Sequence, residues 1–391
     1  MSLDGSPRDQ PQLALQGRLS LLLVAPLSAL ALAGLSPVLP KISAHFAGQP
    51  GADVLVRLLV SAVPAAMILG SLLGGLLADR YGQRKVLLWA LGLYACTGVS
   101  GYVFDNLSAL LVSRIGLGIC NAAAGVIVAA MITTRFPQRL RARWLGFLVT
   151  AGTVSAIAML VAVGALGERN WRLVFLLHVA ALAAILVIFL FVPGDKTTAI
   201  RQQSSARGKF PAVFALVGIA IGALTAISTI FLPYHLAGIG ESNAQRIGFA
   251  IIPNAIAGGV LSFAYGWILA RLGTIKVFAI AFAAGAAGIA VLLVSGNYLG
   301  ALVGMALVGA GVGMAGPNII AAAADATPPE RRSGVIGIVR AATYAGPLIT
   351  QLALEPLSLN YGADSALIVL AIIMLLASVF VIPGRRWLLP G

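Results

Sequence analysis

The chain has 391 residues, of which 60% are hydrophobic and 10% are charged, and its formal net charge is +14 at pH 7. A soluble domain carries about 25% charged residues, so this composition excludes an ordinary soluble enzyme or binding protein. The basic residues are spread along the chain, so their excess does not indicate a nucleic-acid site. Cys96 and Cys120 both lie inside apolar runs and predict no disulfide framework.

After a polar segment at residues 1–17, the chain alternates between long apolar runs and short polar connections. A helix that crosses a bilayer needs about 20 apolar residues, and twelve runs meet that length. They lie near residues 19–45, 54–78, 84–104, 107–134, 143–166, 171–192, 210–236, 244–270, 274–295, 298–324, 333–357 and 363–384. We predict an all-α membrane protein of twelve transmembrane helices in two six-helix bundles, residues 1–193 and 210–391, with a cytoplasmic linker at 194–209.

A short charged stretch connects the second and third runs, where residues 75–85 read GLLADRYGQRK. Its spacing of glycine, aspartate and basic residues resembles the loop 2–3 signature of the major facilitator superfamily. Six positions match that signature: Gly75, Asp79, Arg80, Gly82, Arg84 and Lys85. The resemblance covers nearly the whole chain. It implies a secondary transporter whose two bundles rock around a site near the membrane midplane, with these six residues in the gate.

Asp79 is the one acidic residue of this signature. We expect it to latch the cytoplasmic side in the outward-facing state. Its partner is either Arg80 or the positive N-terminus of span 11, near Arg332 and Ser333.

The two halves of the chain repeat at a fixed offset of 191 residues. This offset carries GLLADRYGQRK onto GWILARLGTIK at residues 266–276, and Asp79 then meets Ala270. Other pairs at the same offset are Gly75 with Gly266, Arg80 with Arg271, Gly82 with Gly273, Lys85 with Lys276, Pro137 with Pro328, Arg141 with Arg332 and Gly146 with Gly337. Matches in two separate stretches indicate a duplicated six-helix unit.

Basic residues dominate the cytoplasmic loops of membrane proteins. Here they concentrate in the loops after spans 2 and 4, in the corresponding loops of the second half, in the linker and after the last span. We therefore expect both termini in the cytoplasm and the protein in the cytoplasmic (inner) membrane. The same residues are expected to attract anionic membrane lipids.

Two arginines fall within predicted spans, Arg114 in span 4 and Arg340 in span 11, whereas every acidic residue falls in a loop or at a helix end. A charge at the centre of a span costs about 2.5–3.5 kcal/mol on insertion scales and usually faces an interior cavity. Arg114 heads the string RIGLGICNAAAG, whose Gly118 resembles the span 4 signature of the superfamily. Helical spacing places Arg114 and Asn121 on one face, so we expect both to look into the same space. The alternative is an arginine satisfied by backbone carbonyl groups.

Polar side chains also recur in the spans of the second half. In span 11, Arg340, Tyr344 and Gln351 share one helix face. The remaining candidates for a substrate site are Thr225, Ser228, Asn254, Tyr265 and Asn318. Each alone is typical of helix packing, and together they predict a site between the bundles. Because both mid-span charges are positive, we expect an anionic organic solute, with Arg340 as its main contact.

The chain shows no metal-ligand spacing of Cys, His, Asp and Glu and no phosphate-binding or hydrolase motif. We therefore expect no catalytic residue, no cofactor and no metal. The span 4 string and PPERRSGVIG at residues 328–337 resemble the branch of drug and organic-solute proton antiporters, although the span 5 signature of that branch is missing. The sequence predicts a monomeric transporter of a small organic solute, coupled to protons or another ion in the export direction. Uptake of an organic anion or a metal chelate stays open; a multidrug cation exporter, a channel and a membrane enzyme are less favoured.

Overall fold

The computed structural model describes residues 13–33, 35, 38–46, 48–49, 51–194, 212–241 and 244–381. Most of the predicted linker, and the basic residues after the last span, lie outside these ranges. Within them, all regular secondary structure is helical. The elements of the first half are α1 (Leu15–Leu22), α2 (Val24–Ala33), α3 (Leu39–His45), α4 (Ala52–Tyr81), α5 (Gln83–Val103), α6 (Leu107–Arg135), α7 (Gln138–Arg169), α8 (Leu173–Leu176), η2 (Leu177–Val179) and α9 (Ala180–Phe191).

The second half follows the same order. Its elements are α10 (Ala212–Ala226), the π-helix η3 (Ile227–Phe231), α11 (Leu232–Gly238), α12 (Ala244–Ser295), α13 (Tyr298–Asp325), η4 (Pro329–Arg331), α14 (Arg332–Tyr361) and α15 (Ala363–Phe380). Nine segments of the described chain are long and apolar enough to cross a membrane, judged by length and composition. One of them, within α12, holds two predicted spans, and the shorter apolar helices α10 and α15 belong to two more. The prediction of twelve spans is therefore confirmed.

The repeat is visible in the backbone at two glycines. Gly82, between α4 and α5, has φ 94° and ψ 145°, and Gly273, inside α12, has φ 73° and ψ 162°. This region of backbone space is essentially open to glycine alone. The second glycine of the loop signature thus allows a tight turn in both halves, and in α12 this turn separates spans 8 and 9.

Glycine also sets the helix packing inside each half. A methyl group at Gly118 would lie 2.5 Å from the carbonyl oxygen of Val63, which joins α6 to α4. A methyl group at Gly309 would collide with the carbonyl oxygen of Asn254, which joins α13 to α12. The two pairs are related by the 191-residue offset. Small residues that let helix backbones touch are the usual means of packing helices in membranes.

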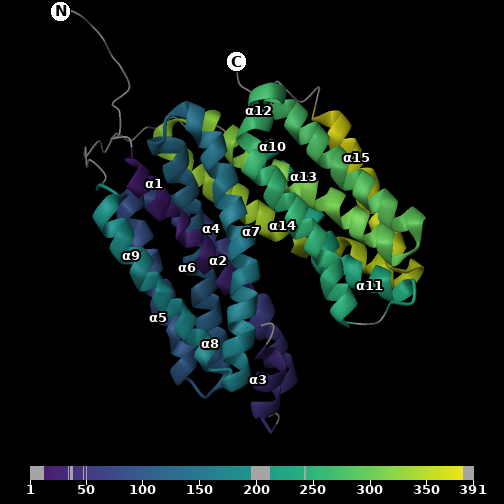
Figure 1. The fold of residues 1–391 in the computed structure, drawn as a ribbon, viewed down its shortest axis with the longest axis horizontal. Coiled ribbons are helices and arrows are strands. Elements are labelled where there is room, and N and C mark those ends of the chain that lie inside the picture. Colours follow the sequence, from purple (N-terminus) through teal and green to yellow (C-terminus); the bar gives the residue numbers. More distant parts are fainter. Residues whose placement is uncertain are drawn as a thin grey trace, which may run out of the picture.

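The two halves lean together at one end and stand apart at the other (Figure 1). The end where they meet holds the last turn of α4 and the first turn of α14, and we call it the joint end. The opposite end holds α3 on one half and α11 on the other (Figure 1), and we call it the far end.

At the far end, ionisable side chains hold the outer segments to their own halves. His45 Nε2 at the end of α3 lies 2.8 Å from Asp105 Oδ1, which also accepts a 2.6 Å hydrogen bond from Arg172. The hydrogen bond with His45, and then the contact with Arg172, hold the pKa of the exposed Asp105 carboxyl below its ordinary value. On the other half, His235 Nδ1 lies 2.6 Å from Asp364 Oδ1 and links α11 to α15.

Candidate functional site

The joint end brings the loop signature of the first half against the first turn of α14. Asp79 Oδ2 accepts a 2.7 Å hydrogen bond from the backbone N–H of Gly334. The first N–H groups of a helix have no partner within the helix and carry partial positive charge, so Asp79 caps α14 from the other half. Of the two partners expected for Asp79, this is the helix N-terminus. The guanidinium of Arg80 instead lies 5.3 Å from the ring centre of Tyr81.

Gln83 adds a second contact across the joint. Its Nε2 donates to Ser333 Oγ at 3.1 Å, and its Oε1 accepts from Thr134 Oγ1 at 3.2 Å. The side chain is buried, and it connects α5 and α6 of one half with α14 of the other. Sequence reasoning missed this residue, because a glutamine in a charged loop signature gives no sign that it will be buried.

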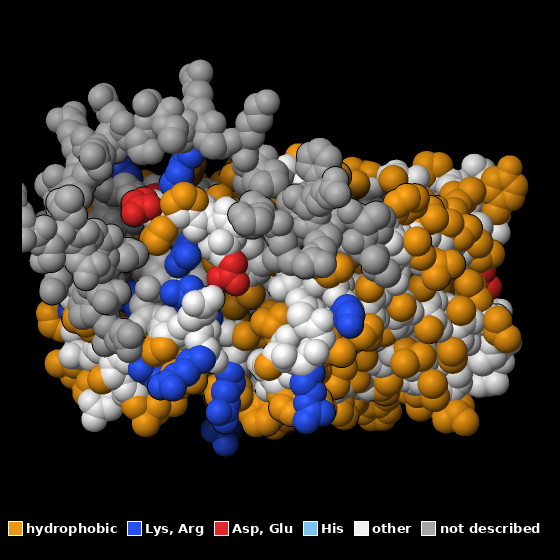
Figure 2. Space-filling model, turned by 90° about the horizontal axis from the view of Figure 1, so that it is seen from above, with side chains coloured by type: hydrophobic (Ala, Val, Ile, Leu, Met, Phe, Trp, Pro, Cys, Tyr) orange, Lys and Arg blue, Asp and Glu red, His pale blue; other side chains and the backbone are white. Residues whose placement is uncertain are grey.

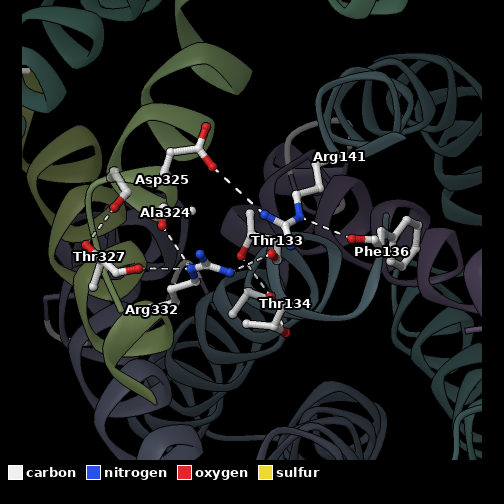
Figure 3. Close-up of polar contacts among 10 residues, drawn as sticks. Thr133, Thr134, Phe136, Arg141, Ala324, Asp325, Thr327 and Arg332 are labelled. Carbon is white, nitrogen blue, oxygen red and sulfur yellow. Dashed lines mark hydrogen bonds and ion pairs between the residues drawn. The ribbon is translucent and has the colours of Figure 1, made fainter. Parts of the chain in front are cut away.

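Two arginines at equivalent positions of the repeat complete the joint (Figure 3). Arg332 Nε donates to the carbonyl oxygens of Ala324 (2.8 Å) and Thr327 (3.1 Å) in its own half. Its NH1 crosses to the carbonyl oxygen of Thr133, at 2.9 Å, in the other half. Arg332 is thus bonded on both sides of the joint.

Arg141 is the counterpart of Arg332 in the first half. Its Nε donates to the carbonyl oxygen of Phe136 at 3.1 Å, the position equivalent to Thr327. Its NH1 lies 4.0 Å from Asp325 Oδ1 across the joint (Figure 3). The 191-residue offset in the sequence is the signal that identifies this pair of arginines.

Glycines bring the two halves into backbone contact at two symmetric places. A methyl group at Gly337 on α14 would collide with the carbonyl oxygen of Ser71 on α4. A methyl group at Gly146 on α7 would collide with the carbonyl oxygen of Ser262 on α12. Ser71 and Ser262 are themselves 191 residues apart. The joint is therefore made twice, once between α4 and α14 and once between α7 and α12.

The remaining residues of the loop signature differ in what they contact. A methyl group at Gly75 would lie 2.5 Å from the carbonyl oxygen of Ser333, so Gly75 allows the close approach of α14. Arg84 NH2 donates to the carbonyl oxygen of Phe189 at 2.7 Å and therefore ties α5 to α9 within the first half. Lys85 is exposed. Only part of the signature thus lies at the joint itself.

Arg340 and Tyr344 come together on α14, as their spacing predicts. Arg340 NH1 donates to the hydroxyl of Tyr344 at 3.4 Å, and both side chains are half-buried. The Nε of Arg340 is buried and has no hydrogen-bond partner in the described chain. Gln351, two turns beyond Tyr344 on the same helix, is also half-buried. Among the described residues, no carboxylate forms an ion pair with Arg340.

The candidates on span 7 lie at the irregular part of that span. Thr225, near the end of α10, donates to the carbonyl oxygen of Gly222 at 2.7 Å, and Ser228 in the π-helix donates to that of Thr225 at 3.0 Å. π-Helical turns inside α-helices are frequent at functional sites. Asn254 on α12 is half-buried, and its Nδ2 has no partner in the described chain.

Two candidates of the second half do not line an open space. Tyr265 and Asn318 are fully buried, and the Tyr265 hydroxyl donates to Asn318 Oδ1 at 3.0 Å. Asn318 Nδ2 donates in turn to the carbonyl oxygen of Thr274 at 2.9 Å. The expectation that these two residues line a cavity is wrong, because they satisfy each other inside the packing between α12 and α13.

The expectation that Arg114 and Asn121 look into the same space is also wrong. Arg114 is buried against α5, where its NH2 lies 3.4 Å and 3.3 Å from the carbonyl oxygens of Thr97 and Gly98. Its guanidinium lies 4.9 Å from the ring centre of Phe175. The alternative of an arginine satisfied by backbone carbonyls fits this geometry.

Asn121 contacts other helices than Arg114 does. Its Oδ1 accepts from Ser28 Oγ at 2.8 Å, and its Nδ2 lies 3.9 Å from Met67 Sδ. It therefore joins α6 to α2 and α4 within the first half. As for metals, the described residues hold no group of three or more His, Cys, Asp or Glu side chains that could bind one.

The profile of the Major Facilitator Superfamily matches residues 21–231 and 213–387. The chain belongs to this superfamily. Superfamily membership accounts for the duplicated six-helix unit and for the loop signature at residues 75–85. Solved structures of transporters share the fold of this chain.

A crystal structure of the human organic anion transporter MFSD10 matches with a TM-score of 0.78 and 16% identity, over 94% of this chain and 99% of that one. At this identity the likeness shows the fold alone.

The curated relatives include proteins named as transporters. An uncharacterized transporter of Escherichia coli, YebQ, is 25% identical over 42% of this chain and 36% of its own length. The gentisate transporter of Corynebacterium glutamicum is 28% identical over 80% of this chain and 75% of its own. Other curated relatives are matched over as little as 26% and as much as 84% of their own length.

Proposed function

We propose that this protein is a secondary active transporter that moves a small organic anion across the cytoplasmic membrane by alternating access. The observation that carries this proposal is the asymmetry of the two ends. The halves are joined at one end by Asp79, Gln83, Arg141 and Arg332, whereas their far ends stand apart (Figure 1). If the termini are cytoplasmic, as the basic loops indicate, this is the outward-facing conformation.

The polar contacts of the joint are weak enough for the two halves to separate and meet again. Its polar contacts are single hydrogen bonds and one loose ion pair, of which each is worth about 0–3 kcal/mol. Its closest backbone contacts are made by glycines, and its side-chain packing includes the ring of Phe147 against that of Phe263. A contact of this strength fits a conformational equilibrium that a substrate is able to shift.

The proposed charge of the substrate rests on Arg340. The predicted spans hold two mid-span arginines and no acidic residue near the middle of any span. Both arginines have a buried Nε without a partner in the described chain. Arg114 is fully buried and donates to two backbone carbonyl oxygens, whereas Arg340 is half-buried and has one long hydrogen bond, to the Tyr344 hydroxyl. A carboxylate is the natural partner for a guanidinium in such a setting. The gentisate transporter among the relatives, which is named for an anion, supports this reading.

Direction and coupling rest on the resemblance to proton antiporters through the span 4 string and residues 328–337. We propose proton-coupled export, with uptake of an organic anion or a metal chelate as the second candidate. The missing span 5 signature favours keeping the second candidate. We further propose that the protein works as a monomer in the inner membrane.

Purified protein in liposomes tests the proposal. Transport of gentisate, of a neutral sugar and of tetraphenylphosphonium is followed under an imposed pH gradient of either sign. We expect saturable flux of the anion only, faster when the gradient drives export. Robust flux of the cation, or equal flux of all three, would contradict an anion transporter. Anion flux that is driven inward by the gradient would instead favour the uptake candidate.

A further inference from the structure

The joint between α7 and α12 is the counterpart of the joint between α4 and α14, but it lacks the acidic residue. At the position of Asp79 it has Ala270, and at the position of Gly334 it has Arg143. A methyl group at Gly266 would lie 2.9 Å from the Cα of Arg143, so the backbones are as close here as in the first joint. Compared with the first joint, the second therefore has one negative charge fewer and one positive charge more.

Two arginines flank a row of aromatic rings at this joint. The guanidinium of Arg143 lies 5.2 Å from the ring centre of Phe147, and that ring lies 5.2 Å from the ring of Phe263 on α12. Trp267 is one turn further along α12, and the guanidinium of Arg271 lies 3.9 Å from its ring centre. We call these five residues the arginine–aromatic ladder.

The ladder faces outward, and its charges are uncompensated. Arg143 and Arg271 are exposed, and in the described part of the chain no carboxylate pairs with either. Phe263 is 58% and Trp267 60% exposed. Both rings lie in a helix long and apolar enough to cross the membrane, so lipid is the medium that covers them. Seen from the joint end, Lys and Arg side chains lie along the rim next to hydrophobic ones (Figure 2).

We propose that the arginine–aromatic ladder binds one anionic phospholipid from the leaflet on the side of the joint end. The two guanidinium groups receive the phosphate, to which arginine donates in bidentate fashion. An acyl chain lies along Phe263 and Trp267, where aromatic rings are favoured at the membrane interface. The phosphate supplies at the second joint the negative charge that Asp79 supplies at the first. This proposal does not depend on which solute is transported.

Native mass spectrometry of the full chain, released from micelles doped with phosphatidylglycerol or phosphatidylcholine, tests the site. We expect the wild type to retain one more phosphatidylglycerol than phosphatidylcholine. The double variant R143A/R271A should lose that lipid, with affinity falling roughly five-fold for each arginine removed. The control R139A/K276A removes two exposed charges from the same end outside the ladder and should keep the lipid. Size-exclusion profiles identify any variant that fails to fold.

The substitution Ala270→Asp tests whether the lipid takes the place of the missing acid. An aspartate here supplies the charge from within the chain, so we expect loss of the retained lipid and a melting temperature that no longer rises with phosphatidylglycerol. Equal retention of both lipids by the wild type overturns the site, as does full retention by R143A/R271A. If A270D still retains the lipid, and its melting temperature still rises with phosphatidylglycerol, then the lipid does not take the place of the missing acid.

Discussion

Asp79 and Gly334 lie 255 positions apart in the chain and are joined by a 2.7 Å hydrogen bond from the Gly334 N–H to the Asp79 carboxylate. The bond links the last turn of α4 to the first turn of α14. Because it exists only while the halves meet at the joint end, its free energy favours one conformation over the other. A negative charge at a helix N-terminus contributes about 0.3–1 kcal/mol, which is small for stability but sufficient to shift a balanced equilibrium.

Asp79→Asn keeps an acceptor oxygen and removes the charge. We expect the population with a closed joint to fall about two- to five-fold, transport to slow, and substrate binding to persist. Distances between spin labels on the ends of α4 and α14 measure the shift. Arg80→Gln is the matched comparison, because the Arg80 guanidinium lies over the Tyr81 ring and, within the described residues, forms no ion pair with Asp79. Unchanged distance distributions in D79N would exclude Asp79 as a latch.

The glycine contacts give a sharper test, since they are steric. Gly146→Ala places a methyl group against the carbonyl oxygen of Ser262, and overpacking costs about 1–3 kcal/mol. This cost applies only to the closed joint, so we expect the same spin-label distances to lengthen. Gly152→Ala on the same helix meets nothing within 4 Å and should behave as wild type. If both variants behave alike, α7 and α12 do not gate the molecule.

The positions of the spans and the repeat could be predicted because they follow from properties that a sequence displays directly. For Asp79 the sequence left two partners open, Arg80 and the N-terminus of span 11, and the structure shows the second. Apolar length predicts a span, and an offset between matching strings predicts that two helices occupy equivalent places. The equivalence of Arg141 and Arg332 also follows from the offset. The carbonyl groups that they bind do not, because every residue has a backbone carbonyl and the sequence does not show which one accepts a bond.

The polar residues inside the spans show where such reasoning stops. Helical spacing locates the Cβ atom, but the long side chain of Arg114 reaches carbonyl oxygens on α5, away from the neighbours of Asn121. Tyr265 and Asn318 are polar because they bind each other across two helices. A polar residue that lines a site and one that joins two helices have the same signature in a single sequence.

The equivalent residues Arg332 and Arg141 should differ in how much each stabilises the joint. Arg332 donates to three carbonyl oxygens, one of them across the joint, whereas Arg141 crosses only through an ion pair at 4.0 Å. Hydrogen bonds from charged groups contribute about 1.5–3 kcal/mol, and partly exposed ion pairs about 0–1 kcal/mol. We expect Arg332→Ala to lower the melting temperature and open the joint more than Arg141→Ala. The reverse order in thermal denaturation would contradict this assignment of contacts.

Single cysteines test the orientation. The basic loops predict that Ser43 and Asn297 lie outside the cell, and Asn297 is exposed. A membrane-impermeant maleimide added to intact cells should therefore label S43C and N297C. On the side predicted to be cytoplasmic, the exposed Lys85 is the position to test. The neighbouring Gln83 is buried and would be protected from the reagent in either orientation. Labelling of K85C from outside the cell would contradict the predicted topology.

The proposed negative charge of the substrate rests on Arg340. In the proposed site its guanidinium has one long hydrogen bond to Tyr344 and a buried Nε without a partner. Within the described residues it forms no ion pair with Asp325 or Glu330. The side chain therefore has donors available for a carboxylate.

Arg340→Ala should nearly remove binding of an anionic solute, because an ionised acceptor would lose a charge-assisted bond worth about 1.5–3 kcal/mol, or roughly 10- to 100-fold in affinity. Arg340→Lys keeps the charge but not the bidentate geometry, so we expect an intermediate loss. Tyr344→Phe frees the guanidinium from its one side-chain partner and should weaken binding less than either. Affinities come from titration of gentisate against each purified variant, with folding checked by thermal denaturation. If folded R340A binds the anion with unaltered affinity, Arg340 is structural and the case for an anionic substrate falls with it.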